Sequence, residues 1–134
     1  LVFQDTFDLN IGIIDQVQSV VFKINTDNGF PLNAALQIYF TDTAYSIQDS
    51  LMTLGNTLIS SGLLNSAGRV IQATHVTATI PMDIDRFSVI KGQSKKIIVR
   101  AILETTDGGS TPVKIYSDYS LGLRLGLKVK LKVP

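Results

Sequence analysis

Four basic side chains near the C-terminus are the first candidates for a binding function. They are Arg124, Lys128, Lys130 and Lys132. All four stand at even-numbered positions, so an extended segment would place them on one face, because side chains alternate between the two faces of a strand. Such a row can contact anionic lipid headgroups or an acidic partner. The same row of charges can equally protect an edge strand from aggregation, so the sequence is consistent with either a binding or a protective role.

Composition excludes several classes of chemistry. The 134 residues contain no cysteine and one histidine, which excludes thiolate zinc sites, iron–sulfur clusters, cysteine nucleophiles and multi-histidine metal sites. His75 has no serine or carboxylate at a spacing typical of a catalytic motif, so a structural role is favoured. The sequence has no nucleophile elbow, phosphate loop or dinucleotide fingerprint. We therefore predict a protein that is not an enzyme and needs no cofactor.

Two groups of acidic and amide residues could in principle hold a cation. Asp83 and Asp85 form a pair, but aspartates just before a helical pattern more commonly cap the helix. Asn25, Asp27 and Gly29 resemble part of a calcium loop without its glutamate ligand, and a turn that ends the preceding strand is favoured. We predict no metal site.

The charge is nearly neutral in sum and uneven along the chain. Twelve basic and eleven acidic residues give a formal net charge of +1, which argues against a nucleic-acid partner. Residues 1–54 nevertheless carry a net charge of −5, and residues 55–134 carry +6. Most of that excess of basic residues lies towards the C-terminus, where the row of four cations is found.

A hydrophobic period of two dominates the chain and predicts strands. It is found at 6–11, 20–24, 36–40, 74–80 and 95–106. The last of these is apolar on both faces, which is typical of a central strand. We expect about eight strands in an all-β, antiparallel β-sandwich of immunoglobulin-like or WHy-like type.

One segment has a helical period instead. Ile84, Phe87 and Ile90 recur at intervals of three, which predicts a short helix near 83–91 with an aspartate cap at its start. Gly92 would end that helix.

The C-terminal segment from Val113 to Val133 predicts one very long strand. Ten of its eleven odd-numbered positions are apolar or aromatic, so one face should be buried throughout. Twenty-one extended residues would span about 70 Å, and we expect the strand to bend at Gly122 and Gly126 and so to serve both sheets.

The chain should form a single domain over residues 1–134. It begins at Leu1 and shows no signal peptide, so we expect a fragment or the mature part of a longer protein. No stretch is long and apolar enough for a transmembrane helix.

Two resemblances to known families follow from particular motifs. Asn25 to Leu32, with the strands around it, resembles the opening of water-stress (WHy) or late-embryogenesis type 2 domains, although those have prolines in place of Thr26 and Asn28. The motifs Gly-Phe-Pro-Leu, Lys-Lys-Ile-Ile-Val-Arg and Tyr-Ser-Asp-Tyr-Ser-Leu are similar to the C-terminal β-sandwich domains of envelope lipoproteins from Bacteroidota. The second resemblance implies an exported protein of the cell envelope or surface and carries no catalytic residue.

Three functions remain for such a domain. The leading hypothesis is a structural or interaction module that associates with a protein partner, or with itself, through exposed strand edges. The first alternative is a carrier of lipid or another apolar ligand, in a groove closed by the predicted helix. The second is a glycan-binding module that uses the four tyrosines, which are Tyr39, Tyr45, Tyr116 and Tyr119.

Overall fold

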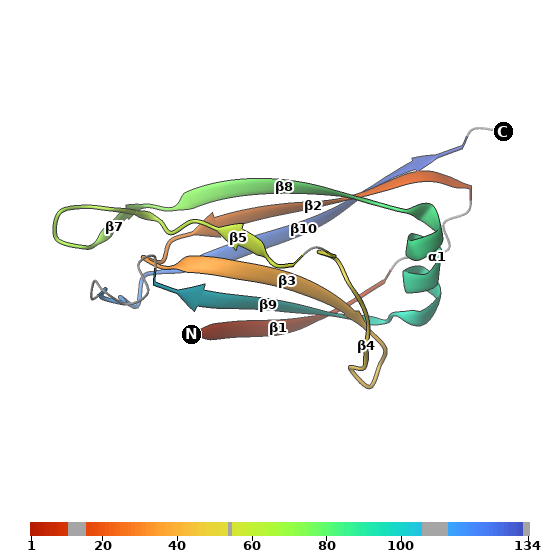
Figure 1. Ribbon diagram of the computed structural model, residues 1–134, viewed down its shortest axis with the longest axis horizontal. Coiled ribbons are helices and arrows are strands. Elements are labelled where there is room, and N and C mark those ends of the chain that lie inside the picture. The colour runs from red at the N-terminus through yellow and green to blue at the C-terminus, as the bar shows by residue number, and fades with distance from the viewer. Residues whose placement is uncertain (11–15, 54, 106–112, 133–134) are drawn as a thin grey trace.

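The computed structural model describes residues 1–10, 16–53, 55–105 and 113–132 (Figure 1). They form ten strands and one helix: β1 (Val2–Asp8), β2 (Val17–Asn28), β3 (Asn33–Thr41), β4 (Ile47–Ser50), β5 (Thr57–Ile59), β6 (Leu63–Leu64), β7 (Val70–Gln72), β8 (Thr74–Met82), α1 (Ile84–Gln93), β9 (Lys96–Glu104) and β10 (Leu121–Leu131). This confirms the predicted all-β class with one short helix.

The strands form two antiparallel sheets of unequal size. A five-stranded sheet has the order β1-β9-β3-β4, with β5 also pairing with β3. A three-stranded sheet has the order β10-β2-β8, and β6 and β7 make a separate hairpin. Figure 1 shows the two sheets as layers, with α1 across one end. The architecture is a β-sandwich, as predicted, and β9 is a central strand between β1 and β3.

The core lies between the two layers and follows the period of two. Val20, Phe22 and Ile24 of β2 point inward and are almost fully buried. They face buried side chains of β3, and the rings of Phe22 and Phe40 lie 5.7 Å apart. Burial of one such phenylalanine stabilises the fold by about 1.5–3 kcal/mol, so this alternation fixes which face of each strand looks inward.

The helix closes one end of the core. Its buried residues are Phe87 and Ile90, and the Asp83 side chain accepts a hydrogen bond from the Arg86 backbone N–H, as an N-cap does. The helix continues to Gln93, so the expectation that Gly92 ends it is wrong, and Ser94 is the C-cap. No helix among the described residues has the length and apolar character that crossing a membrane requires.

The turn predicted at residues 25–29 lies further along the chain. β2 continues to Asn28, and the chain turns between Gly29 and Leu32. Asn28 is fully buried and organises this turn: its side chain donates to the backbone oxygens of Leu32 and Ser60 and accepts from the Phe30 N–H. Asn28 is thus one of the polar residues that predict a turn, and it stabilises the observed turn from the last position of β2.

The predicted long C-terminal strand is much shorter than expected. β10 begins at Leu121, where its pairing partner is Asn28, the last residue of β2. The pairing runs without a break past Gly122 and Gly126, and its one irregularity lies between Lys130 and Leu131. β10 therefore belongs to one sheet, and the predicted bends at the two glycines are wrong. Val133 lies outside the described residues.

Candidate functional site

One side of the sandwich is open, because the two sheets do not end together. β1 is the outermost strand of the five-stranded sheet, and all seven of its residues are exposed. Phe3 and Phe7 keep 41% and 50% of their surface accessible. The three-stranded sheet ends at β10, so it supplies no strand to cover these two rings.

An apolar groove runs along this open side, between β1 and β10. Its larger part has a volume of about 500 Å³, and an adjoining part has about 320 Å³. Both parts are lined by Phe7, Val99 and Leu123, so they form one trough. The other residues that line the larger part are Phe3, Gln4, Asp5, Phe30, Leu36, Ala101, Tyr119, Ser120 and Leu121. Such a trough can take up an apolar chain or a row of apolar side chains.

Two charged residues line the groove in the part of the chain that the structure describes, Asp5 in its larger part and Arg124 in its adjoining part. Among the described residues that line it, Asp5 carries the only carboxylate, and its Oδ1 accepts a hydrogen bond of 2.8 Å from the Thr6 N–H. At the end of β1 the Lys96 ammonium contacts Asp8, and this hydrogen bond to a carboxylate raises the pKa of Lys96. The described lining has no nucleophile beside a general base.

The free edge of β10 borders this groove with unpaired backbone groups. The Gly29 N–H donates to the Ser120 oxygen, so in this antiparallel pair the even-numbered residues of β10 bond to β2. The odd-numbered residues from Leu121 to Val129 therefore direct their N–H and C=O groups away from β2, towards the open side. Their side chains point between the sheets, where Leu121, Leu123 and Leu125 are half-buried.

The neighbouring edges are more protected than that of β10. The same alternation places the nitrogen of Pro81 on the outer edge of β8, where it has no N–H to offer a further strand. On β1 the outward N–H of Thr6 is already bonded to the Asp5 side chain. β10 is therefore the edge of this sheet that is most open to pairing.

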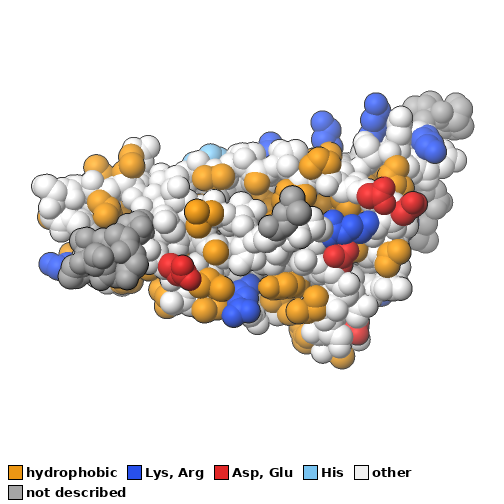
Figure 2. Space-filling view, viewed as in Figure 1, with side chains coloured by type: hydrophobic (Ala, Val, Ile, Leu, Met, Phe, Trp, Pro, Cys, Tyr) orange, Lys and Arg blue, Asp and Glu red, His pale blue; other side chains and the backbone are white. Residues whose placement is uncertain are grey.

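The predicted basic row lies on the outer face of the three-stranded sheet. Arg124, Lys128 and Lys130 are exposed along β10, and Lys132 follows directly after it. None of the four forms an ion pair within the part of the chain that the structure describes. Figure 2 shows basic side chains projecting beyond the upper right margin, where β10 ends.

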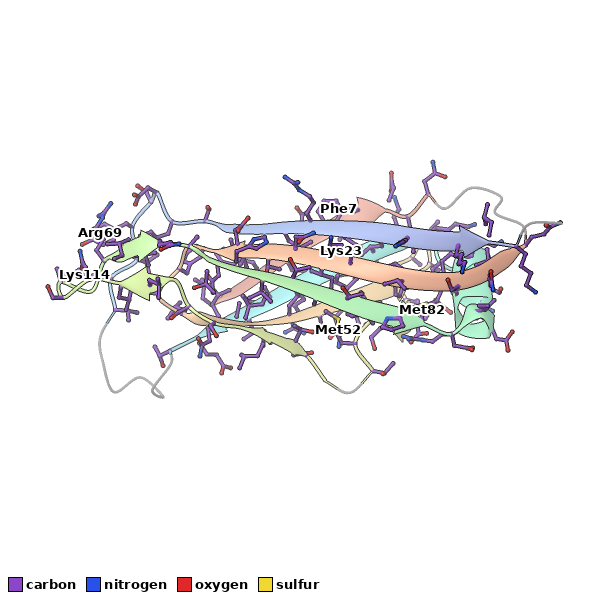
Figure 3. All side chains as sticks on the ribbon, turned by 90° about the horizontal axis from the view of Figure 1, so that it is seen from above. Phe7, Lys23, Met52, Arg69, Met82 and Lys114 are labelled. Atoms are coloured by element: carbon purple, nitrogen blue, oxygen red, sulfur yellow. The ribbon has the colours of Figure 1, made fainter. Side chains whose placement is uncertain are left out.

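Lys23 extends the row onto the middle strand, and the sequence reasoning missed it. It is exposed on β2 opposite Gly126, and Figure 3 shows it on the outer face of the sheet. The signal was present, because Phe22 and Ile24 point inward and the residue between them must point outward. What the sequence lacked was the pairing of β2 with β10.

His75 has a partner that its neighbours in the sequence do not supply. Its Nδ1 lies 2.7 Å from Oδ1 of Asp27 on the adjacent strand, and its Nε2 lies 3.4 Å from Oγ1 of Thr77. That hydroxyl donates instead to Oδ1 of Asn25, at 2.7 Å, so it is not aligned as a nucleophile. All of these side chains lie on an exposed sheet surface, and neither part of the groove reaches them. The cluster is a surface hydrogen-bond network.

The four tyrosines do not form one surface. Tyr116 and Tyr119 meet edge to face with ring centres 5.3 Å apart, and the Arg69 guanidinium lies 4.3 Å from the centre of the Tyr116 ring. Tyr39 lies in β3, and Tyr45 lies in the turn before β4, towards the opposite end in Figure 1. The structure therefore brings together one pair and leaves the other two apart from it.

The remaining candidates have structural roles. Asp83 caps α1 and Asp85 lies in its first turn, while Asn25 and Asp27 are strand residues rather than a loop. Among the described residues, no three histidine, aspartate or glutamate side chains gather as a metal site would require. Comparisons of the chain with protein-family models, with curated proteins and with solved structures found no match.

Proposed function

We propose that this domain is a non-enzymatic interaction module that binds an extended segment of a partner chain along β10. The observation that carries the proposal is the open side of the sandwich. There, a strand edge with unpaired backbone groups borders an apolar groove, and the opposite wall of that groove carries two exposed phenylalanines. A strand added to β10 would enlarge the three-stranded sheet and cover β1.

Both halves of such an interaction are supported by the geometry. Main-chain hydrogen bonds would form with the outward groups of Leu121 to Val129, and alternate side chains of the partner would enter the groove. The sequence resemblance to envelope lipoproteins of Bacteroidota supports a place on the cell surface, and we include that location in the proposal.

Hydrogen exchange tests the proposal at individual backbone amides. In the protein alone, the amides of odd-numbered residues from Leu121 to Val129 should exchange quickly, and those of Gly122, Arg124 and Gly126 slowly. Addition of a peptide that alternates valine and serine, about nine residues long, should slow exchange at the odd-numbered amides. Unchanged exchange at these amides in the presence of saturating peptide would refute strand addition at β10.

An apolar ligand is the second candidate, and the groove itself favours it. A trough of about 500 Å³ with a mostly aliphatic and aromatic lining suits an acyl chain. The lining includes no residue of α1, so the expectation that the helix closes this groove is wrong. A fluorescent fatty acid that binds while the odd-numbered amides of β10 still exchange quickly would favour this function over strand addition.

A further inference from the structure

We infer that the partner segment alternates apolar with acidic residues. This inference rests on the proposed function, and it adds the chemistry of the partner. The apolar side chains would occupy the groove, and the acidic ones would lie beside the basic row on the outer face of the sheet.

The alternation follows from how β10 presents its two faces. Any strand that pairs with β10 places its residues alternately on the inner and outer face, in step with β10 itself. Positions beside Leu123 and Leu125 therefore point into the groove, and positions beside Lys128 and Lys130 point outward.

The inner positions call for apolar side chains. They would contact the exposed rings of Phe3 and Phe7 on one wall of the groove and the leucines of β10 on the other. Their arrival would remove these rings from water, and burial of apolar surface is the main source of affinity in such a contact. A charged side chain there would lose its hydration, and the described lining offers only two charged residues, Asp5 and Arg124, to replace it.

The outer positions call for acidic side chains. Arg124, Lys128 and Lys130 are exposed and form no ion pair with the described residues, whereas Arg69, Arg86 and Lys96 all have carboxylate partners. Because the even-numbered residues bond to β2, they would form the non-hydrogen-bonded pairs with an antiparallel newcomer. Side chains approach most closely in such pairs, with Cα atoms about 4.5 Å apart.

A second copy of β10 fits this edge poorly. It would bring two basic rows to neighbouring strands, about 4.8 Å apart, and like charges on adjacent strands destabilise their pairing. The same repulsion protects the edge from association with itself. The basic row would therefore disfavour pairing with a second β10 and favour pairing with an acidic strand.

Three labelled peptides of equal length, about nine residues, test the inference by fluorescence anisotropy. All three have valine at alternate positions, and the remaining positions are all glutamate in the first peptide, all serine in the second and all lysine in the third. The glutamate peptide should bind about tenfold more tightly than the serine peptide at low salt. This difference in affinity should shrink at about 0.5 M salt, because salt screens the charges. The lysine peptide should bind most weakly.

A charge-reversed variant supplies the matched arm. Lys128→Glu combined with Lys130→Glu should shift the preference to the lysine peptide, while Arg100→Glu, which changes an exposed cation on the other sheet, should leave it unaltered. Circular dichroism of each variant establishes that it is folded.

The outcomes separate this inference from the function on which it rests. Equal binding of all three peptides with protection of the odd-numbered amides would overturn the acidic preference and leave strand addition standing. Failure of every peptide to bind would overturn both. Binding of phosphatidylserine vesicles that depends on Lys128 and Lys130, without a preference for the glutamate peptide, would make the row a lipid-headgroup surface and overturn the inference.

Discussion

The ion pair of Asp49 with Arg86 ties the five-stranded sheet to the helix. Nε of Arg86 donates to Oδ2 of Asp49 at 2.7 Å, and Nη2 donates to Oδ1 at 3.1 Å. Nη2 also contacts the backbone oxygen of Ser50. Both side chains are partly buried, so this two-point contact is stronger than a fully exposed surface pair. It is the residue-scale link that keeps α1 over the end of the core.

The Asp49 carboxylate should make the stability depend on pH. Its hydrogen bond from Arg86 lowers the pKa of Asp49 below the usual 3.8. A lowered pKa means that the stabilisation is fully present above the unfolded pKa and is lost as the pH falls through the folded pKa. Asp49→Asn should therefore cost about 1–2 kcal/mol at pH 7. In urea unfolding, the difference in free energy of unfolding between variant and wild type should become smaller below about pH 4. A difference that does not change with pH would contradict this prediction.

At the scale of the element, β10 shows what a period of two can and cannot predict. The alternation located this strand and the outward side of its cations, because both depend on neighbouring residues only. It did not locate the start of the strand, since Val113 to Ser120 have the same alternation. Pairing begins at Leu121 because β2 ends at Asn28, and that limit is set by a segment far away in the sequence.

The two edges of β10 should respond differently to proline. Leu127 directs its N–H to the free edge and Lys128 directs its N–H to β2, although both side chains are exposed. Lys128→Pro should therefore cost about 1–3 kcal/mol, because it removes a ladder hydrogen bond and leaves the acceptor on β2 without a partner. Leu127→Pro should cost much less and still abolish peptide binding, because, like Pro81 on the outer edge of β8, it would offer no N–H to a further strand. Thermal unfolding compares the two, and Leu127→Ala controls for the lost side chain; equal losses of stability would refute the assigned alternation.

At the scale of the whole molecule, the groove results from a mismatch in width, because four strands lie side by side in one sheet, β1-β9-β3-β4, and three in the other. No local pattern reports which strands share a sheet, so the sequence predicted a sandwich without placing its open side between β1 and β10. Nothing in the sequence around Phe3 and Phe7 of β1 distinguishes them from core residues. They line a groove because the opposite sheet stops at β10.

An apolar dye should report this mismatch directly. Phe7→Ser should lower the fluorescence of anilinonaphthalene sulfonate bound to the folded protein, because Phe7 lines both parts of the groove. The cost in stability should be about 1 kcal/mol or less, since half of the side chain is already exposed. Leu58→Ser, at a side chain 66% exposed on β5, is the control and should leave the groove signal unchanged. Dye binding that is equal in both variants would place the dye elsewhere.

The pairing of β2 with β10 also has a consequence for how the chain folds. Val21 lies beside Lys128, so this sheet needs contact between segments separated by almost the entire described sequence. Loops of that length close slowly, and proteins dominated by such contacts fold over milliseconds to seconds. During synthesis, β2 leaves the ribosome long before β10 exists. Until β10 has been made, the edge of β2 that later pairs with it has unpaired backbone groups. During that period a chaperone or a wrong strand can bind the edge of β2 in place of β10.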